Sequence, residues 1–241
     1  MAEGSWSVAV MCYNEAPTLT EVVTRTLEVV GSLADDYEVI IVDDGSTDGS
    51  AELADELART NTNVRVVHHE VNKGIGEVLR TAYRVADKDL ISIVPGDLEF
   101  DPKDLRSGYH LVEEHTVVAY SIIKLPPLRR RLVTFLQSLL NSILFGLKVS
   151  RVNWVKIVHA GPLRQMDLIS RSPVIETEVL VRLQRRGYRI VEVPSNNEMR
   201  LDRGGGLTVR AYAVAIWASL LETFVLWRAL ARESSARGSE R

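Results

Sequence analysis

The 241-residue chain has one cysteine, few aromatic residues and no strong excess of either charge. Because Cys12 has no second cysteine to pair with, an intramolecular disulfide is excluded, which is typical of proteins in a reducing compartment. Aromatic side chains make up 6% of the sequence and the formal net charge is −3, so a basic surface with interleaved aromatic rings for nucleic acid is not expected. The composition favours a cytoplasmic protein with no nucleic-acid partner.

The chain also lacks an apolar run long enough to span a bilayer. Residues 132–147 (LVTFLQSLLNSILFGL) carry no charge, and residues 211–227 are apolar apart from Glu222. A helix over the first run extends about 24 Å, which is less than the roughly 30 Å of a hydrocarbon core. Three arginines precede this run and a lysine follows it, where basic side chains can reach lipid headgroups. The pattern predicts amphipathic helices at a membrane surface, at 129–148 and 207–228; the alternative is two helices buried together or in a dimer.

The front half of the chain alternates apolar strands with helical segments. Helices are predicted from Pro17 to about residue 33, after residue 50, and from Gly74 to about residue 86. The apolar runs between them predict strands at 6–13, 37–44, 64–69 and 89–94. Strands that are apolar throughout and alternate with helices are typical of a parallel sheet covered on both faces. The sequence therefore predicts an α/β fold with a mostly parallel sheet.

Polar residues follow the ends of these strands. In parallel α/β sheets, ligands bind beyond the carboxyl ends of the strands. The candidates at this edge are Asn14, Glu15, Asp43, Asp44, Lys73 and Asp97. Core packing explains such a set poorly, because acids are normally exposed. His68 and His69 end the third strand, and we interpret them as packing residues without a metal role.

The loop after the fourth strand presents two carboxylates, Asp97 and Glu99, in the stretch VPGDLEFDP. Mg²⁺ and Mn²⁺ prefer oxygen ligands and often join protein carboxylates to phosphate oxygens. Such a metal neutralises a leaving nucleoside diphosphate and eases the breaking of a bond at a sugar carbon. We expect Asp97 and Glu99 to bind the metal. The alternative is a pair of solvated turn residues.

Four segments carry a family resemblance: CYNEA (12–16), EVIIVDDGSTDGS (38–50), NKGIGEVLRTAY (72–83) and GDLEFDP (96–102). Together they resemble the successive motifs of family-two inverting glycosyltransferases with the Rossmann-like GT-A fold. The branch they resemble is the polyprenyl-phosphate sugar synthases of the dolichyl-phosphate mannosyltransferase type. The resemblance continues more weakly to about residue 206. It implies a catalytic domain over residues 1–206, followed by the apolar helix and a disordered tail at 229–241.

The resemblance also implies roles for individual residues. The first group would bind the nucleotide sugar: Tyr13, Asn14, Glu15, Asp43, Asp44, Lys73 and Asp97. Asp97 would serve in catalysis as a metal ligand with Glu99, and Arg200 or Arg203 would cover the donor phosphates. Lys156 and Arg164 are further candidates for cationic cover of an acceptor phosphate. The family's usual first metal-binding acid is replaced by Pro95, which leaves open whether the metal site is altered or weakened.

The predicted activity is transfer of a mannose- or glucose-type sugar from a nucleoside diphosphate sugar, GDP- or UDP-linked, to a polyprenyl phosphate. A phosphate acceptor is already anionic and needs no general base, whereas a hydroxyl acceptor does. Localisation is expected at the cytoplasmic face of a membrane, without a spanning helix. Two alternatives remain: the same fold acting on a soluble hydroxyl acceptor, and a non-catalytic sugar-nucleotide-binding protein with a degenerate metal site.

Overall fold

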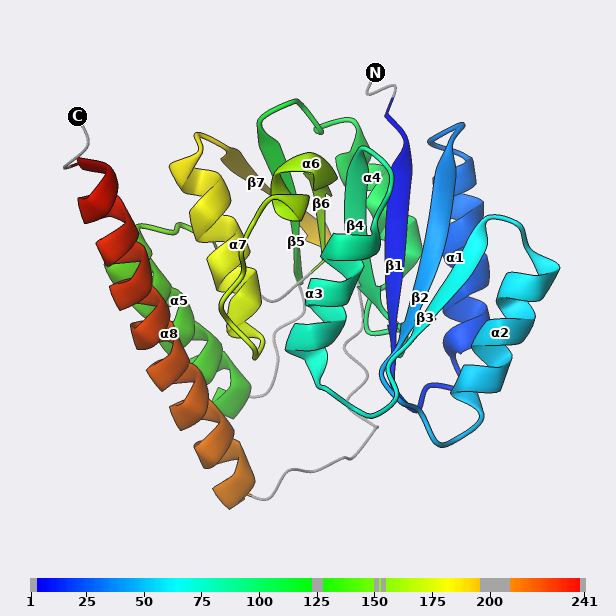
Figure 1. Ribbon diagram of the computed structural model, residues 1–241, viewed down its shortest axis with the longest axis horizontal. Coiled ribbons are helices and arrows are strands. Elements are labelled where there is room, and N and C mark those ends of the chain that lie inside the picture. Colours follow the sequence, from blue (N-terminus) through cyan, green and yellow to red (C-terminus); the bar gives the residue numbers. More distant parts are fainter. Residues whose placement is uncertain (1–3, 123–127, 150–151, 153–154, 196–208, 239–241) are drawn as a thin grey trace.

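The computed structural model describes residues 4–122, 128–149, 152, 155–195 and 209–238. Within these residues, seven strands form one sheet in the order β3-β2-β1-β4-β6-β5-β7 (Figure 1). The strands are β1 (Trp6–Cys12), β2 (Tyr37–Asp43), β3 (Val64–His68), β4 (Leu90–Pro95), β5 (Thr116–Ile122), β6 (Lys156–His159) and β7 (Arg189–Ser195). Every paired neighbour is parallel except β6, which runs antiparallel to β4 and β5. The predicted mostly parallel sheet is confirmed.

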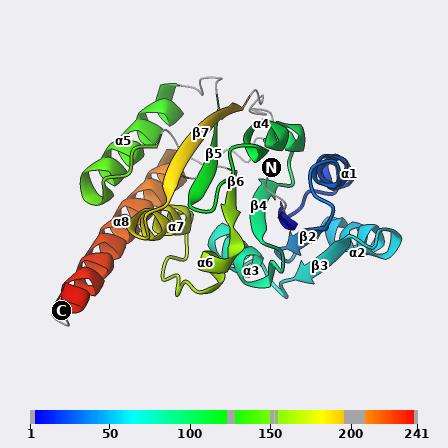
Figure 2. The same cartoon turned by 90° about the horizontal axis from the view of Figure 1, so that it is seen from above.

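Helices cover both faces of this sheet, as the two views show (Figures 1 and 2). The first four are α1 (Leu19–Gly31), α2 (Ser50–Thr60), α3 (Ile75–Val85) and α4 (Leu105–Tyr109), with a short 3-10 turn at Pro102–Asp104. The later ones are α5 (Leu128–Phe145), α6 (Ala160–Arg164), α7 (Val174–Arg185) and α8 (Val209–Gly238). Helices α1, α2 and α4 pack on one face, and α3, α6 and α7 on the other.

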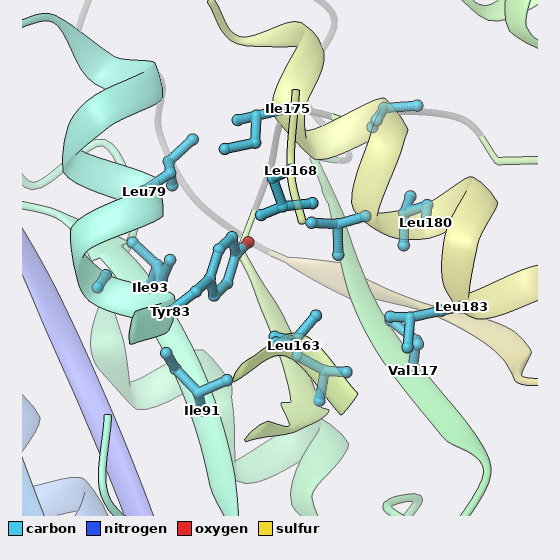
Figure 3. Packing of buried hydrophobic residues seen from close by; sticks show 14 of the residues in the cluster. Leu79, Tyr83, Ile91, Ile93, Val117, Leu163, Leu168, Ile175, Leu180 and Leu183 are labelled. Atoms are coloured by element: carbon cyan, nitrogen blue, oxygen red, sulfur yellow. The ribbon is translucent and has the colours of Figure 1, made fainter. Parts of the chain in front are cut away.

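Strand side chains alternate between two hydrophobic clusters because successive residues of a strand point to opposite faces. In β1, Val8 and Val10 join the cluster under α1, while Ala9 joins the cluster under α3 and α7. In β4, Ile91 and Ile93 face α3 and α7. Figure 3 shows the second cluster, in which aliphatic side chains from β4, α3, α6 and α7 surround the ring of Tyr83. This cluster forms the floor of the cavity described below.

Helices α5 and α8 lie side by side beyond the β7 edge of the sheet (Figures 1 and 2). Helix α8 continues past residue 228, where the sequence predicts the start of a disordered tail. The extension is held by α7, because Leu230 is buried, its carbonyl accepts from Arg185, and Arg182 pairs with Glu233. None of the helices in the described part of the chain has the length and apolar character needed to cross a bilayer.

Candidate active site

The loops after β1 and β2 are joined to each other by hydrogen bonds. Asn14 adopts a positive φ of 56°, its backbone N–H donates to the Ser46 hydroxyl (2.9 Å), and its side-chain oxygen accepts from Thr47 N (2.8 Å). The Glu15 N–H donates to the Ser50 hydroxyl (2.8 Å). The side chain of Asn14 is therefore used to hold the two loops together, while Tyr13 remains exposed at the surface.

The two acids after β2 are both buried, at 2% exposure. Asp44 accepts hydrogen bonds from the backbone N–H groups of Lys73 (2.9 Å) and Gly74 (2.8 Å), and it contacts His69 Nδ1 (2.7 Å). Asp43 contacts His68 Nδ1 at 3.0 Å. That contact raises the pKa of His68 above its usual value of 6.5. Asp44 thus fixes the loop after β3 against the end of β2.

These contacts correct the interpretation of the two histidines as packing residues. Both imidazole rings lie beside the acids at the strand ends, and each ring also has a second partner. His69 Nε2 contacts the Thr81 hydroxyl at 2.9 Å, and His68 Nε2 contacts Asp55 at 3.1 Å. The pairing of β2 with β3 places Asp43 directly opposite His68, and this register is seen only in the structure.

The loop after β4 turns back against β1. Gly96 N donates to the Met11 carbonyl (2.9 Å), and a Cβ at Gly96 would lie 2.5 Å from that same oxygen, so only glycine fits. Asp97 Oδ1 then accepts from Glu99 N (2.8 Å), and Leu98 between them has a positive φ of 62°. This tight turn holds both acidic residues at the carboxyl end of β4, half-buried.

A cavity of about 540 Å³ opens at this edge of the sheet. The loops contribute Tyr13, Glu15, Asp44, Asp97 and Glu99 to its lining. Asn14, Asp43 and Lys73 belong to the same loops but do not line it. The structure therefore brings five of the predicted site residues together around one cavity. The cavity also contains Cys12, whose thiol has a pKa raised to about 11 by burial and so stays protonated.

The cavity continues along β4 from Pro95 through Ile93 to Ile91. At about 3.3 Å per residue, this is a depth of roughly 13 Å. We call this deeper part the inner chamber. It is lined by the aliphatic residues Val78, Leu79, Ile91, Ile93 and Val158, together with three polar residues, Tyr83, Lys156 and Glu176.

The three polar residues of the inner chamber form a buried cluster, each between 5% and 6% exposed. Lys156 pairs with Glu176, and its ammonium also donates to the Val152 carbonyl (3.0 Å). The Tyr83 hydroxyl donates to the other oxygen of Glu176 (2.9 Å). Burial, reinforced by the nearby carboxylate, raises the pKa of Tyr83 well above 10. The sequence indicated Lys156 as a candidate cation, but no role was predicted for Glu176 or for Tyr83, the last residue of the 72–83 segment.

The predicted arginines have different outcomes. Arg200 and Arg203 lie outside the described residues. Arg164 donates to the carbonyls of Ala86 (2.9 Å) and Asp87 (3.2 Å), which precede β4 at the amino end of the strand. Arg164 is therefore at the opposite end of β4 from the cavity loops, and its prediction as a cation beside the acceptor is wrong.

In the part of the chain that the structure describes, no group of three or more His, Cys, Asp or Glu side chains is arranged to hold a metal ion. Asp97 and Glu99 both line the cavity, whereas the neighbouring wall at Pro95 is apolar. Mg²⁺ commonly uses only one or two protein carboxylates and takes its remaining ligands from water and phosphate. The donor set therefore fits a metal that binds together with a diphosphate better than one that resides permanently in the protein.

Comparison with known proteins identifies the family. The model of glycosyl transferase family 2 matches residues 7–161, which include the loops after β1, β2, β3 and β4. The chain belongs to glycosyl transferase family 2. This confirms the family and the enzyme class that the motifs predicted.

Two similar proteins are longer than this chain. Glycosyltransferase AglD of Haloferax volcanii is 30% identical over 215 residues, which cover 81% of this chain and 33% of the relative. An undecaprenyl-phosphate 4-deoxy-4-formamido-L-arabinose transferase of Proteus mirabilis is 33% identical over 101 residues, covering 41% of this chain and 31% of the relative. The matched segments thus span about a third of each relative.

Solved structures share the fold. Glucosyl-3-phosphoglycerate synthase of Mycobacterium tuberculosis, in complex with Mn²⁺, uridine diphosphate and phosphoglyceric acid, has a TM-score of 0.71 at 19% identity. The match covers 94% of this chain and 79% of that one. At this identity the likeness concerns the fold, and it confirms the GT-A architecture expected of the family.

Proposed function

We propose that this family-2 enzyme transfers a sugar, with inversion, from a nucleoside diphosphate sugar to a polyprenyl phosphate at a membrane surface. The observation that carries the proposal is the cavity at the carboxyl ends of β1, β2 and β4, which is lined by the residues of the family motifs. The named relatives support the acceptor class, since one of them is an undecaprenyl-phosphate transferase. The likeness to a synthase that binds uridine diphosphate supports the donor class.

The donor diphosphate would lie beside Asp97 and Glu99, with the nucleoside over the loops that carry Tyr13, Glu15 and Asp44. These loops are mutually braced, so the donor end is preorganised before any ligand binds. A Mg²⁺ or Mn²⁺ ion held by Asp97 and Glu99 would supply positive charge to the leaving diphosphate. Arg200 and Arg203 are proposed as additional cover for the phosphates. Comparison of the affinities for UDP and GDP determines whether the base is uracil or guanine.

A polyprenyl phosphate fits this cavity better than a neutral hydroxyl acceptor. A hydroxyl acceptor needs a general base close to the sugar. Glu176 is an acid in the cavity, but its two oxygens are engaged by the Tyr83 hydroxyl and the Lys156 ammonium. A carboxylate held in this way is a poor proton acceptor, whereas an ionised phosphate can attack the anomeric carbon without one. The soluble-acceptor alternative would require Glu176 to leave this cluster, or one of the loop acids to act as the base.

Membrane association would use the outer face of α5 and α8. Large apolar side chains are exposed on both helices: Phe135, Leu136, Leu139 and Ile143 on α5, and Trp217, Leu221, Phe224 and Val225 on α8. Several exposed apolar side chains on two neighbouring helices are typical of a membrane or protein interaction site. A lipid surface suits an acceptor with a long hydrocarbon chain, and we propose a peripheral location on the cytoplasmic face.

The reaction is tested by measuring release of UDP or GDP from sugar nucleotides, with Mn²⁺ or Mg²⁺, in the presence and absence of undecaprenyl phosphate. We expect release that depends on both the metal and the lipid phosphate. Release driven equally by soluble hydroxyl compounds would favour the soluble-acceptor enzyme. Nucleotide binding without turnover on any acceptor would favour the non-catalytic binder.

The membrane surface is tested by flotation with anionic phospholipid vesicles. Ile143→Glu and Val225→Glu introduce a charge at side chains that are 70% and 60% exposed, so folding should be preserved while vesicle binding falls. Thr24→Glu on α1 is the matched control, because it adds the same charge at an exposed site on a different face. Equal vesicle binding by all three variants and the parent would refute the assignment of this face.

A further inference from the structure

The inner chamber contains a charged pair where hydrophobic packing would be expected. Lys156 and Glu176 are each 6% exposed, and aliphatic side chains from α3, β4 and β6 form the rest of the chamber. Burying two charges carries a desolvation penalty that their attraction often fails to recover, so well-packed apolar residues of similar volume are frequently as stable or more so. A need for structural stability alone is therefore a weak explanation for this pair.

The pair also faces open space. Tyr83, Lys156 and Glu176 come from α3, β6 and α7, and all three line the same cavity as Asp97. In Figure 3 the Tyr83 ring lies among Leu79, Ile91 and Ile93, with its hydroxyl directed away from α3. The cluster combines hydrogen-bond donors (ammonium and phenol) with an acceptor (carboxylate) at the end of a chamber whose other walls are apolar.

We propose that the Tyr83–Lys156–Glu176 cluster binds hydroxyl groups of the transferred sugar and determines which sugars the enzyme accepts. The inference rests on the proposed function, because it assumes that the diphosphate binds at Asp97. From there the sugar would extend into the inner chamber, which leads from Pro95 to Ile91 along β4. The aliphatic walls would pack on the C–H faces of the ring, and the cluster would pair with its hydroxyls.

The charge of the cluster indicates the class of sugar. The ammonium and the carboxylate compensate each other, so the cluster presents no net charge to its ligand. An acidic or an amino sugar would add a third charge to this compensated pair and leave one buried charge without a partner. A neutral sugar with neighbouring hydroxyls can donate to Glu176 and accept from Lys156 without leaving a buried charge unpaired. The preferred donor therefore carries a neutral, hydroxylated sugar.

The test separates sugar binding from nucleotide binding. Isothermal titration with Mn²⁺ measures the affinities of UDP and GDP, and of UDP-glucose, UDP-galactose, GDP-mannose and UDP-glucuronic acid. The sugar contribution is the ratio of the nucleotide Kd to the Kd of its sugar conjugate. The parent should bind at least one neutral conjugate more tightly than the bare nucleotide, and UDP-glucuronic acid less tightly. In Glu176→Gln this ratio should fall about tenfold, while the affinity for the bare nucleotide is unchanged.

Tyr83→Phe provides a second variant if Glu176→Gln folds poorly, and it should lower the ratio in the same direction. Tyr120→Phe is its matched control, since Tyr120 is a buried tyrosine whose hydroxyl donates to the Leu105 carbonyl (2.9 Å) and does not line the cavity. The control should lose stability without changing the ratio.

The outcomes distinguish the inference from the proposed function on which it depends. If neither UDP nor GDP binds the parent, the proposed function fails. If a nucleotide binds but no neutral conjugate binds more tightly than that nucleotide, the inference is overturned. It is also overturned if the Kd ratio is the same in Glu176→Gln and Tyr83→Phe as in the parent, because the cluster then does not contribute to sugar binding.

Discussion

The substitution Asp44→Asn tests whether the acid after β2 acts by fixing the loop after β3. Asp44 is 2% exposed, and its two oxygens accept from the N–H groups of Lys73 and Gly74 at 2.9 and 2.8 Å. Asparagine keeps the shape but has one acceptor oxygen, so its NH₂ group would face one of these N–H donors. Losing a hydrogen bond to a charged group costs about 1.5–3 kcal/mol, and the opposed donors add to this loss.

We therefore expect Asp44→Asn to lower the free energy of unfolding by about 2–4 kcal/mol, measured by urea denaturation. Asp48→Asn is the matched control, because Asp48 also accepts from two backbone N–H groups, those of Ala16 (3.2 Å) and Ser50 (3.1 Å), but is exposed. Its loss should be about 1 kcal/mol or less. Equal losses for the two variants would refute the idea that burial of Asp44 makes it the main anchor of the loop.

Three further predictions concern the metal, pH and packing. Asp97→Ala should remove the gain in nucleotide affinity that Mn²⁺ gives the parent, as measured by titration with and without EDTA. Because Asp43 raises the pKa of His68, the stability that this contact contributes should be fully present below pH 6.5 and be lost as the pH rises through the folded-state pKa. The difference in unfolding free energy between the parent and His68→Gln should therefore shrink as the pH rises above 6.5. Gly76→Ala should destabilise the protein by about 1–3 kcal/mol, since a Cβ there would lie 1.9 Å from the Arg171 carbonyl oxygen; urea denaturation measures it.

Each of these has an outcome that contradicts it. An Asp97→Ala variant that retains the Mn²⁺-dependent gain would refute the metal assignment. A parent–variant difference for His68→Gln that grows with pH would show that the contact prefers neutral imidazole. Gly161→Ala in α6 is the control for Gly76→Ala, because no atom lies within 4 Å of a Cβ added there. If both glycine variants are as stable as the parent, α3 and the loop before α7 can separate freely.

The front half of the fold could be predicted because its signals are local. Strands β1, β2 and β4 are almost entirely buried, β3 is mostly half-buried, and each was recognisable as an apolar run bounded by turn residues. Their observed bounds lie within one or two residues of the predicted ones. The loops after them were predictable for the same reason, since a parallel sheet brings the carboxyl ends of its strands to one edge.

The back half gave weaker signals. Strand β6 has only four residues, and β7 carries exposed and half-buried residues along most of its length. Neither resembles the long buried runs of β1, β2 and β4. Strand β6 is also antiparallel, which brings Lys156 near the carboxyl end of β4 although it begins its own strand. A residue that starts a strand is not expected at the ligand edge of a parallel sheet, so its position depended on topology that the sequence pattern does not reveal.

The polar cluster of the inner chamber could not be predicted from local sequence signals either. Tyr83 and Glu176 are 93 residues apart and meet only because α3 and α7 pack on the same face of the sheet. Each lies within a helix whose pattern predicts ordinary packing. Tyr83 is the last residue of the 72–83 segment, and Glu176 lies outside the four segments. Neither stands at a strand end or turn, in contrast to the acids after β2 and β4, where the backbone itself is constrained.

Pro95 connects these two parts of the cavity. It ends β4 opposite Met11, and the N–H that bonds to the Met11 carbonyl comes from Gly96, so proline is accommodated without the loss of that hydrogen bond. A carboxylate at this position would face the cavity shared by Asp97, Glu99 and Glu176, and the like charges would repel one another. Proline instead leaves an apolar wall between the acids of the loop and the Lys156–Glu176 pair. Asp97 and Glu99 would thereby be left to the proposed diphosphate and metal, and the inner chamber remains apolar except at the cluster proposed to bind the sugar.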